Sequence, residues 1–237
     1  MAFFQEPRSQ PFLRAPAAVL GLIALLVAAH IARLLAPAER AAEIIRSYAF
    51  IPARYSQAYL AAHGANPGTL FERALPFVSY IFLHADFGHL AVNSVWLLAF
   101  GSIVARRFGA MLFFALFLLC GIAGAGTYLA LNWGSTAYVI GASGAISGLM
   151  GAGFRMMAGS LQPHGPPKLG SLLSRQVLTW TAVWVGVNLL AGVTGLGQGT
   201  EVHLIAWQAH LGGYAAGLLL AGPFAAIRDR RTGEGAV

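Results

Sequence analysis

Charged residues and cysteine are what this sequence has least of. Only 10% of its 237 residues are charged, against about 25% in an ordinary soluble domain, so a water-soluble globule is a poor interpretation. The single cysteine, Cys120, excludes a disulfide framework, a CxxC redox pair and a cysteine-rich zinc site within the chain. The sequence also lacks an HExxH motif, which removes the usual ligand set of a zinc protease.

Long hydrophobic runs are what the sequence has in quantity. Hydrophobic residues make up 57% of the chain, and its basic residues stand at the ends of apolar runs instead of forming the patch that a nucleic-acid binder needs. A helix crosses the bilayer with about 20 apolar residues. The runs near this length predict an all-α membrane protein, a bundle of six transmembrane helices at 16–36, 88–105, 110–131, 142–158, 177–193 and 204–227.

The basic residues predict how this bundle is oriented. In a six-span arrangement, the side that holds both chain ends has the larger share of them: Arg8, Arg14, Arg106, Arg107, Arg155, Lys168, Arg175, Arg228, Arg230 and Arg231. The opposite side has fewer basic residues and collects acidic ones: Arg40, Arg46, Arg54, Arg73, Glu39, Glu43, Glu72, Asp86 and Glu201. Because positive residues mark the cytoplasmic side, we expect both termini to be cytoplasmic.

These charges divide the chain into a cytoplasmic N-tail at 1–15, a membrane domain at 16–227 and a cytoplasmic C-tail at 228–237. The first apolar run is longer than the core of a signal peptide, so we expect it to be kept as a span. A six-span arrangement without appended domains favours the inner membrane of a bacterium.

Within the membrane domain, residues 37–87 form a connection much longer than the few residues that usually join neighbouring helices. Its aromatic side chains can settle in the membrane interface: Phe50, Tyr55, Tyr59, Phe71, Phe77, Tyr80 and Phe82. Composition leaves two interpretations open, a structured loop that contributes to function or a cap that only covers the bundle.

A few polar side chains stand inside the apolar runs, where such groups cost free energy and tend to mark function. His89 and Asn93 are four residues apart, so they project from one face of a helix. Ser143 starts the fourth run, and His210 lies in the sixth. Each also has a structural interpretation: interhelical hydrogen bonds for the first two, a helix N-cap for Ser143, and a core histidine or a weakly supported metal ligand for His210.

Glycine spacing predicts that two of these residues meet. The fourth and sixth runs each carry a small-xxx-small pair, which lets two helix backbones approach closely: Gly144 with Gly148, and Gly213 with Gly217. Ser143 directly precedes the first pair, and His210 stands three residues before the second. Close contact between these helices would therefore bring the Ser143 hydroxyl to the His210 imidazole.

A hydroxyl within hydrogen-bond reach of an imidazole is what nucleophilic catalysis requires. Burial disfavours the imidazolium form, which leaves His210 neutral and able to accept the proton of Ser143. His89, Asn93 and the backbone amide of Ser143 can donate to the oxyanion of an acyl-transfer reaction. No acidic residue is placed to complete a triad, so these residues predict a Ser/His dyad.

Three motifs stand in order on the second, fourth and sixth runs: HLAVN at 89–93, GASG at 141–144 and AHLGGYAAG at 209–217. Together they resemble the rhomboid family of intramembrane serine proteases, over roughly 76–222 of this chain. The resemblance implies a six-helix bundle around a water-filled cavity and a half-embedded first loop. It also implies that the fifth helix and the loop after it gate access, and that no metal or organic cofactor is needed.

The same resemblance assigns roles to individual residues. It implies Ser143 as the nucleophile, His210 as the general base, and His89 and Asn93 as oxyanion donors. The segment FLHADFGH at 82–89 supplies a further family histidine, His84. The supporting residues are His84 and the motif glycines Gly141, Gly144, Gly213 and Gly217.

The sequence departs from the family pattern at two places. Leu75 and Pro76 stand where members often have Trp-Arg, which bears on how the first loop is anchored. Ser147 stands where many members carry an aromatic residue against the histidine. We expect Tyr214 or Trp207 to hold the histidine instead.

The sequence therefore predicts a serine endopeptidase that cleaves transmembrane segments of other membrane proteins, with those proteins and the lipid bilayer as its partners. Two further classes stay open. A catalytically silent relative would bind membrane proteins without cleaving them. A small transporter would line a proton or solute path with His89, Asn93 and His210.

Overall fold

The computed structural model describes residues 15–160, 169–194 and 206–232. The long elements in these ranges are all helical: α1 (Ala17–Leu35), α6 (Phe87–Trp96), the π-helical turn η3 (Leu97–Gly101), α7 (Ser102–Leu131), α8 (Ser143–Ser160), α9 (Arg175–Thr194) and α10 (Trp207–Thr232). The predicted all-α membrane bundle is confirmed. Residues 1–14 of the predicted N-terminal tail and the predicted positions Lys168 and Glu201 lie outside the described residues.

Four helical segments of the described chain are long and apolar enough to cross a membrane: Ala17–Leu35, Phe87–Leu131, Arg175–Thr194 and Trp207–Arg231. The 45-residue segment joins two predicted runs and breaks at Gly109, where φ is 79°. A positive φ of this kind is cheap only for glycine. The 18 residues of α8 are not among the four segments, because glycines, serines and Arg155 lower their mean hydropathy. That the chain crosses the membrane six times remains a prediction.

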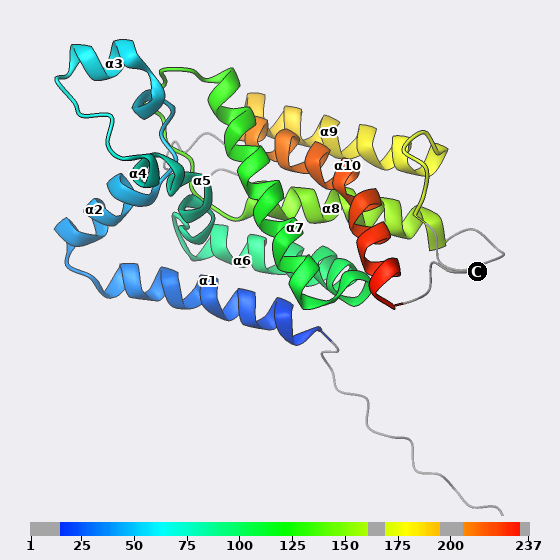
Figure 1. Ribbon diagram of the computed structural model, residues 1–237. Coiled ribbons are helices and arrows are strands. Elements are labelled where there is room, and N and C mark those ends of the chain that lie inside the picture. The colour runs from blue at the N-terminus through cyan, green and yellow to red at the C-terminus, as the bar shows by residue number, and fades with distance from the viewer. Residues whose placement is uncertain (1–14, 161–168, 195–205, 233–237) are drawn as a thin grey trace, which may run out of the picture.

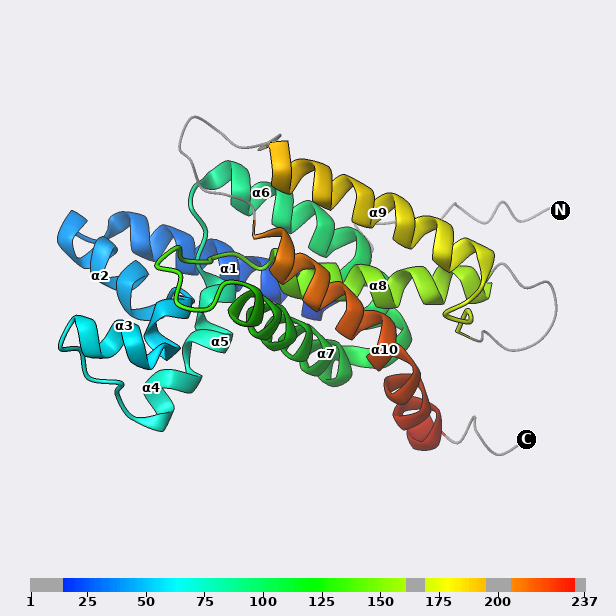
Figure 2. The same cartoon turned by 90° about the horizontal axis from the view of Figure 1, so that it is seen from above.

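The helices α7, α8 and α10 form the centre of the bundle (Figures 1 and 2). Most residues of α8 are buried, so its glycine-rich sequence suits a helix surrounded by protein. Alongside α8 and α10 runs α9, of which Val177 is the one buried residue. Accordingly α9 covers the centre from outside, and apolar side chains such as Val183 and Val187 face outward with about 60% exposure.

Glycines let α8 and α10 approach at backbone distance. A Cβ atom placed on Gly148 would lie 2.7 Å from the carbonyl oxygen of Gly213. Cβ atoms on Gly213 and Gly217 would collide with the carbonyl oxygens of Gly144 and Gly148, respectively. The close contact predicted for the two small-xxx-small pairs is therefore confirmed.

The predicted long loop is built mainly from short helices: α2 (Ala38–Tyr48), η1 (Pro52–Tyr55), α3 (Gln57–Ala62), α4 (Leu70–Ala74), α5 (Pro76–Ser79) and η2 (Tyr80–Phe82). Phe50 is fully buried and lies 4.8 Å, between ring centroids, from Phe77. Its backbone exchanges hydrogen bonds of 2.9 and 3.0 Å with Val139. This loop segment is thus tied to the chain that leads into α8.

The positions Leu75 and Pro76, which depart from the family pattern, form a helix start. Pro76 is the buried first residue of α5, and Leu75 is its N-cap. The helix α10 continues to Thr232, so the first residues of the predicted C-terminal tail at 228–237 are helical.

Candidate active site

The long loop before α6 holds the residues that precede Ser143 in place. The backbone N–H of Gly141 donates to the carbonyl of Tyr80 at 2.9 Å, and the Tyr80 hydroxyl donates to the carbonyl of Gly121 at 2.8 Å. Gly141 has a φ of 116°, which side-chain-bearing residues rarely adopt. Ser143 follows as the first residue of α8, so it lies inside the helix rather than at its N-cap.

The side chains of Ser143 and His210 meet. The Oγ atom of Ser143 lies 2.7 Å from Nε2 of His210, which is on the first turn of α10. This contact is the one that the glycine spacing predicts.

The other ring nitrogen of His210 contacts a residue that the sequence analysis missed. Nδ1 lies 2.8 Å from Oδ1 of Asn188 on α9. The amide nitrogen of Asn188 donates to the carbonyl of Trp184 at 3.0 Å. The one available signal was that Asn188 is an amide in an apolar run. Tyr214, expected to hold His210, instead stacks on Trp184 with ring centroids 4.2 Å apart.

These contacts determine which ring nitrogen of His210 carries the hydrogen. A backbone carbonyl only accepts, so the Asn188 nitrogen must face Trp184 and its oxygen must face His210. That oxygen also only accepts, so Nδ1 of His210 carries the hydrogen. In the neutral ring Nε2 is then the acceptor, and the Ser143 hydroxyl donates to it.

The predicted oxyanion donors lie on α6. Asp86 caps this helix by accepting the N–H of His89 at 2.8 Å. A Cβ atom on Gly141 would lie 2.7 Å from Nε2 of His89 and 3.8 Å from Oγ of Ser143, so the ring and the hydroxyl border the same small space. Asn93 is buried, and its amide donates to the carbonyl of His89 at 3.0 Å.

His84 is fully buried behind His89, with ring centroids 5.1 Å apart. Burial, followed by the neighbouring His89 and His30, lowers the pKa of His84 from 6.5 to about 3. The ring is therefore neutral at physiological pH and contributes no positive charge to the site.

This lowered pKa predicts acid sensitivity. Below pH 6.5 the unfolded chain binds a proton at His84 that the folded chain rejects, so stability falls as the pH drops toward 3. One such group contributes a slope of up to about 1.4 kcal/mol per pH unit to the free energy of unfolding. We expect His84→Gln to unfold with a shallower pH dependence in detergent between these limits. If the free energy of unfolding depended on pH equally in the variant and the parent protein, His84 would not be the source of the acid sensitivity.

The fold and these contacts define a helical membrane protein in which a serine and a histidine are hydrogen-bonded inside the bundle. Comparison with protein families matches residues 72–226 to the Rhomboid domain. The match spans more than half of the chain, which therefore belongs to the rhomboid family, whose members are usually intramembrane serine proteases, although inactive members exist. A search of curated proteins gives no significant match.

Proposed function

We propose that this protein is an intramembrane serine endopeptidase that cleaves transmembrane segments of other membrane proteins. The observation that carries the proposal is the 2.7 Å contact between Oγ of Ser143 and Nε2 of His210 in a rhomboid-family chain. An activated hydroxyl beside a neutral imidazole is the starting arrangement of acyl transfer.

The first half of the proposed reaction forms an ester. Oγ of Ser143 attacks the scissile carbonyl carbon while its proton passes to Nε2 of His210. The resulting oxyanion accepts hydrogen bonds from the side chains of His89 and Asn93 and from the N–H of Ser143. When the peptide C–N bond breaks, the imidazolium returns the proton to the leaving amine.

The second half releases the other product. Water attacks the ester carbon and loses a proton to His210, and Ser143 recovers that proton as the carboxylic acid leaves. His210 thus acts as base and acid in both halves. The proposal needs no metal or organic cofactor.

Substrate preference follows from backbone access. A peptide bond inside a stable helix is not extended, so segments weakened by Gly or Pro near the membrane surface should be favoured. We further propose that both termini face the cytoplasm and that the membrane is a bacterial inner membrane. The bundle end where α10 finishes is rich in arginine, as a cytoplasmic end should be.

A reconstitution experiment tests the proposed function. The purified protein is placed in vesicles with a single-span substrate that contains Gly and Pro near one membrane surface, and the products are identified by mass spectrometry. The matched substrate has Leu at those positions. We expect one cleavage in or beside the weakened segment and at least about tenfold slower cleavage of the Leu version. Binding of both substrates without cleavage would support a silent relative and refute the protease.

A further inference from the structure

The contacts of α9 with α10 form one stripe along each helix. On α9 the stripe consists of Thr181, Trp184 and Asn188, whose spacing of three and four residues places them on one face. Thr181 Oγ1 lies 2.7 Å from the hydroxyl of Tyr214, and the ring of Trp184 stacks on that tyrosine. Tyr214 is four residues after His210, so the stripe continues directly to the histidine.

Asn188 lies at the end of this stripe, and its two hydrogen bonds fix the orientation of its side-chain amide. Its nitrogen is committed to the carbonyl of Trp184, and its oxygen accepts from Nδ1–H of His210. A neutral imidazole can carry its hydrogen on either nitrogen, but only the Nδ1–H form can accept the proton of Ser143 at Nε2. The amide therefore selects the form of His210 that can act as a base.

We propose that Asn188 is a positioning residue that holds His210 in its basic tautomer and aims Nε2 at Ser143. This inference rests on the proposed function and deepens it. In other nucleophilic sites a third group, beside the nucleophile and the base, orients the base, and Asn188 takes that place here. It also makes α9 part of the catalytic arrangement, although that helix contributes no group that touches the reacting atoms.

Substitutions of Asn188 test the proposal through kinetics. We expect Asn188→Ala to lower kcat for the reconstituted substrate by at least about tenfold, with KM within about twofold of the parent protein, because binding groups are untouched. The matched control is Asn132→Ala, which removes an amide that makes the same type of bond, to the carbonyl of Tyr128 at 2.9 Å, at the C-terminal end of α7. The control should keep the parent kcat.

The pH–rate profile separates positioning from a merely structural role. Asn188→Asp keeps an acceptor opposite Nδ1 but adds a negative charge, which favours the imidazolium form. We expect this variant to retain activity with the acid limb of its profile moved up by about one pH unit or more. Ala and Asp variants with the parent profile and parent kcat would overturn the proposal.

A spectroscopic readout keeps this inference distinct from the proposed function. Protein with ¹⁵N-labelled imidazoles reports the tautomer by NMR without any turnover, and His210→Ala identifies the signal. We expect the Nδ1–H form in the parent protein and in Asn132→Ala, and a mixture of tautomers in Asn188→Ala. An unchanged His210 signal in Asn188→Ala refutes the role of Asn188, even if the parent protein cleaves no substrate.

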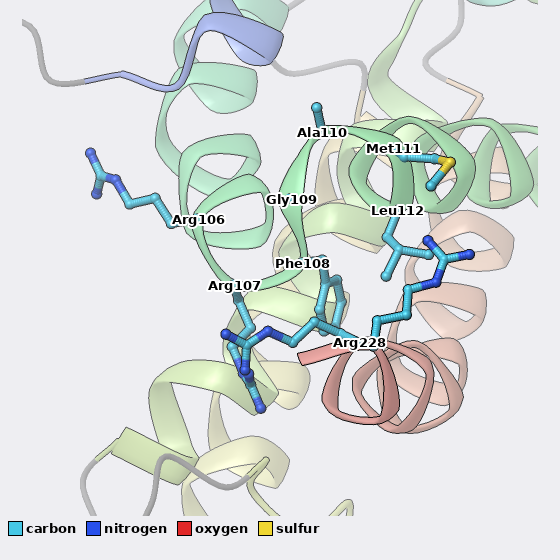
Figure 3. A pocket seen from close by; sticks show the side chains of 9 residues that line it. Arg106, Arg107, Phe108, Gly109, Ala110, Met111, Leu112 and Arg228 are labelled. Carbon is cyan, nitrogen blue, oxygen red and sulfur yellow. The ribbon is translucent and has the colours of Figure 1, made fainter. Parts of the chain in front are cut away.

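A second observation, independent of the site, lies at the other end of α10. A groove of about 420 Å³ opens where the chain turns at Gly109 (Figure 3), and its lining combines arginines with apolar side chains: Arg106, Arg107, Arg228, Arg231, Phe108, Met111 and Leu112. Arg106 extends away from Phe108 at the rim (Figure 3). Asp229 pairs with both Arg107 and Arg228 at 3.2 Å.

The geometry points to an anionic phospholipid, with its phosphate against the arginines and its acyl chain along Met111 and Leu112. Guanidinium groups bind phosphate oxygens with charge-assisted hydrogen bonds. The apolar wall gives a lipid more contact than a free phosphate ion would have. The groove lies at the Gly109 break within the Phe87–Leu131 segment and near the last residues of α10, where spanning helices reach the headgroup region.

Thermal unfolding in mixed micelles tests this lipid site. We expect phosphatidylglycerol, but not phosphatidylcholine or inorganic phosphate, to raise the melting temperature of the parent protein by several degrees. Arg231→Gln should lose most of this shift, whereas Arg230→Gln, which removes the same charge from a residue outside the groove lining, should keep it. Equal shifts in both variants, or an equal shift with inorganic phosphate, would overturn the proposal.

Discussion

Replacing Ser143 with alanine should abolish peptide cleavage, lowering the rate by at least about ten thousandfold. The hydroxyl is the only group that the proposed reaction uses to form a bond to substrate, and it lies 2.7 Å from the base that activates it. The variant should fold normally, because an alanine in the first turn of α8 removes one oxygen and introduces no clash. Rates are measured on the reconstituted substrate, with thermal unfolding as the folding check.

Ser147→Ala is the matched control for this variant. Ser147 is one turn further along α8 and is buried, and its hydroxyl donates to the carbonyl of Ser143 at 2.7 Å. Its loss removes a serine hydroxyl from the same helix without removing the proposed nucleophile. We expect its cleavage rate to stay within about threefold of the parent rate, since a hydrogen bond to a carbonyl that is also used in the helix contributes only about 1 kcal/mol. Equal loss in both variants would contradict the assignment of Ser143.

The second large effect concerns stability. We expect Gly217→Val to lower the free energy of unfolding by about 3 kcal/mol or more, because its side chain would collide with the backbone carbonyl of Gly148 and force α8 and α10 apart. A backbone atom cannot rotate away as the end of a flexible side chain can. Separation of these helices would also part Ser143 from His210, so activity should fall together with stability.

Gly126→Val provides the control for the valine substitution. Gly126 is on α7, and a Cβ atom at this position meets no other atom within 4 Å. We expect this variant to unfold within about 1 kcal/mol of the parent protein, as residues in open helix positions do. If Gly217→Val were as stable as Gly126→Val in the same detergent, the backbone contact between α8 and α10 would not be part of the folded protein.

Much of the bundle could be predicted from the sequence, because apolar length and glycine spacing are local signals. The observed α1, α8 and α9 begin and end within two residues of the predicted runs. The meeting of Ser143 with His210 could be predicted because two glycine pairs determine which helix faces touch. The long loop was predicted only as rich in aromatic residues, since its short helices depend on tertiary contacts such as those of Phe50 with Val139.

Asn188 could not be assigned from the sequence for a physical reason. The apolar residues of α9 are distributed around the whole helix, so nothing in their pattern says which face turns inward. The face is set by contacts that are distant along the chain, namely Tyr214 with Thr181 and with Trp184. An amide in such a helix is therefore recognisable as unusual, whereas its partner becomes known only from the fold.

Covalent labelling tests whether His210 activates the Ser143 hydroxyl. Detergent-purified parent protein, Ser143→Ala and His210→Ala are treated with a fluorophosphonate probe, and the labelled residue is identified by mass spectrometry. If His210 activates this hydroxyl, only the parent protein is labelled, on Ser143. A folded parent protein that takes up no probe, or a His210→Ala variant that is labelled as fast as the parent, would contradict it.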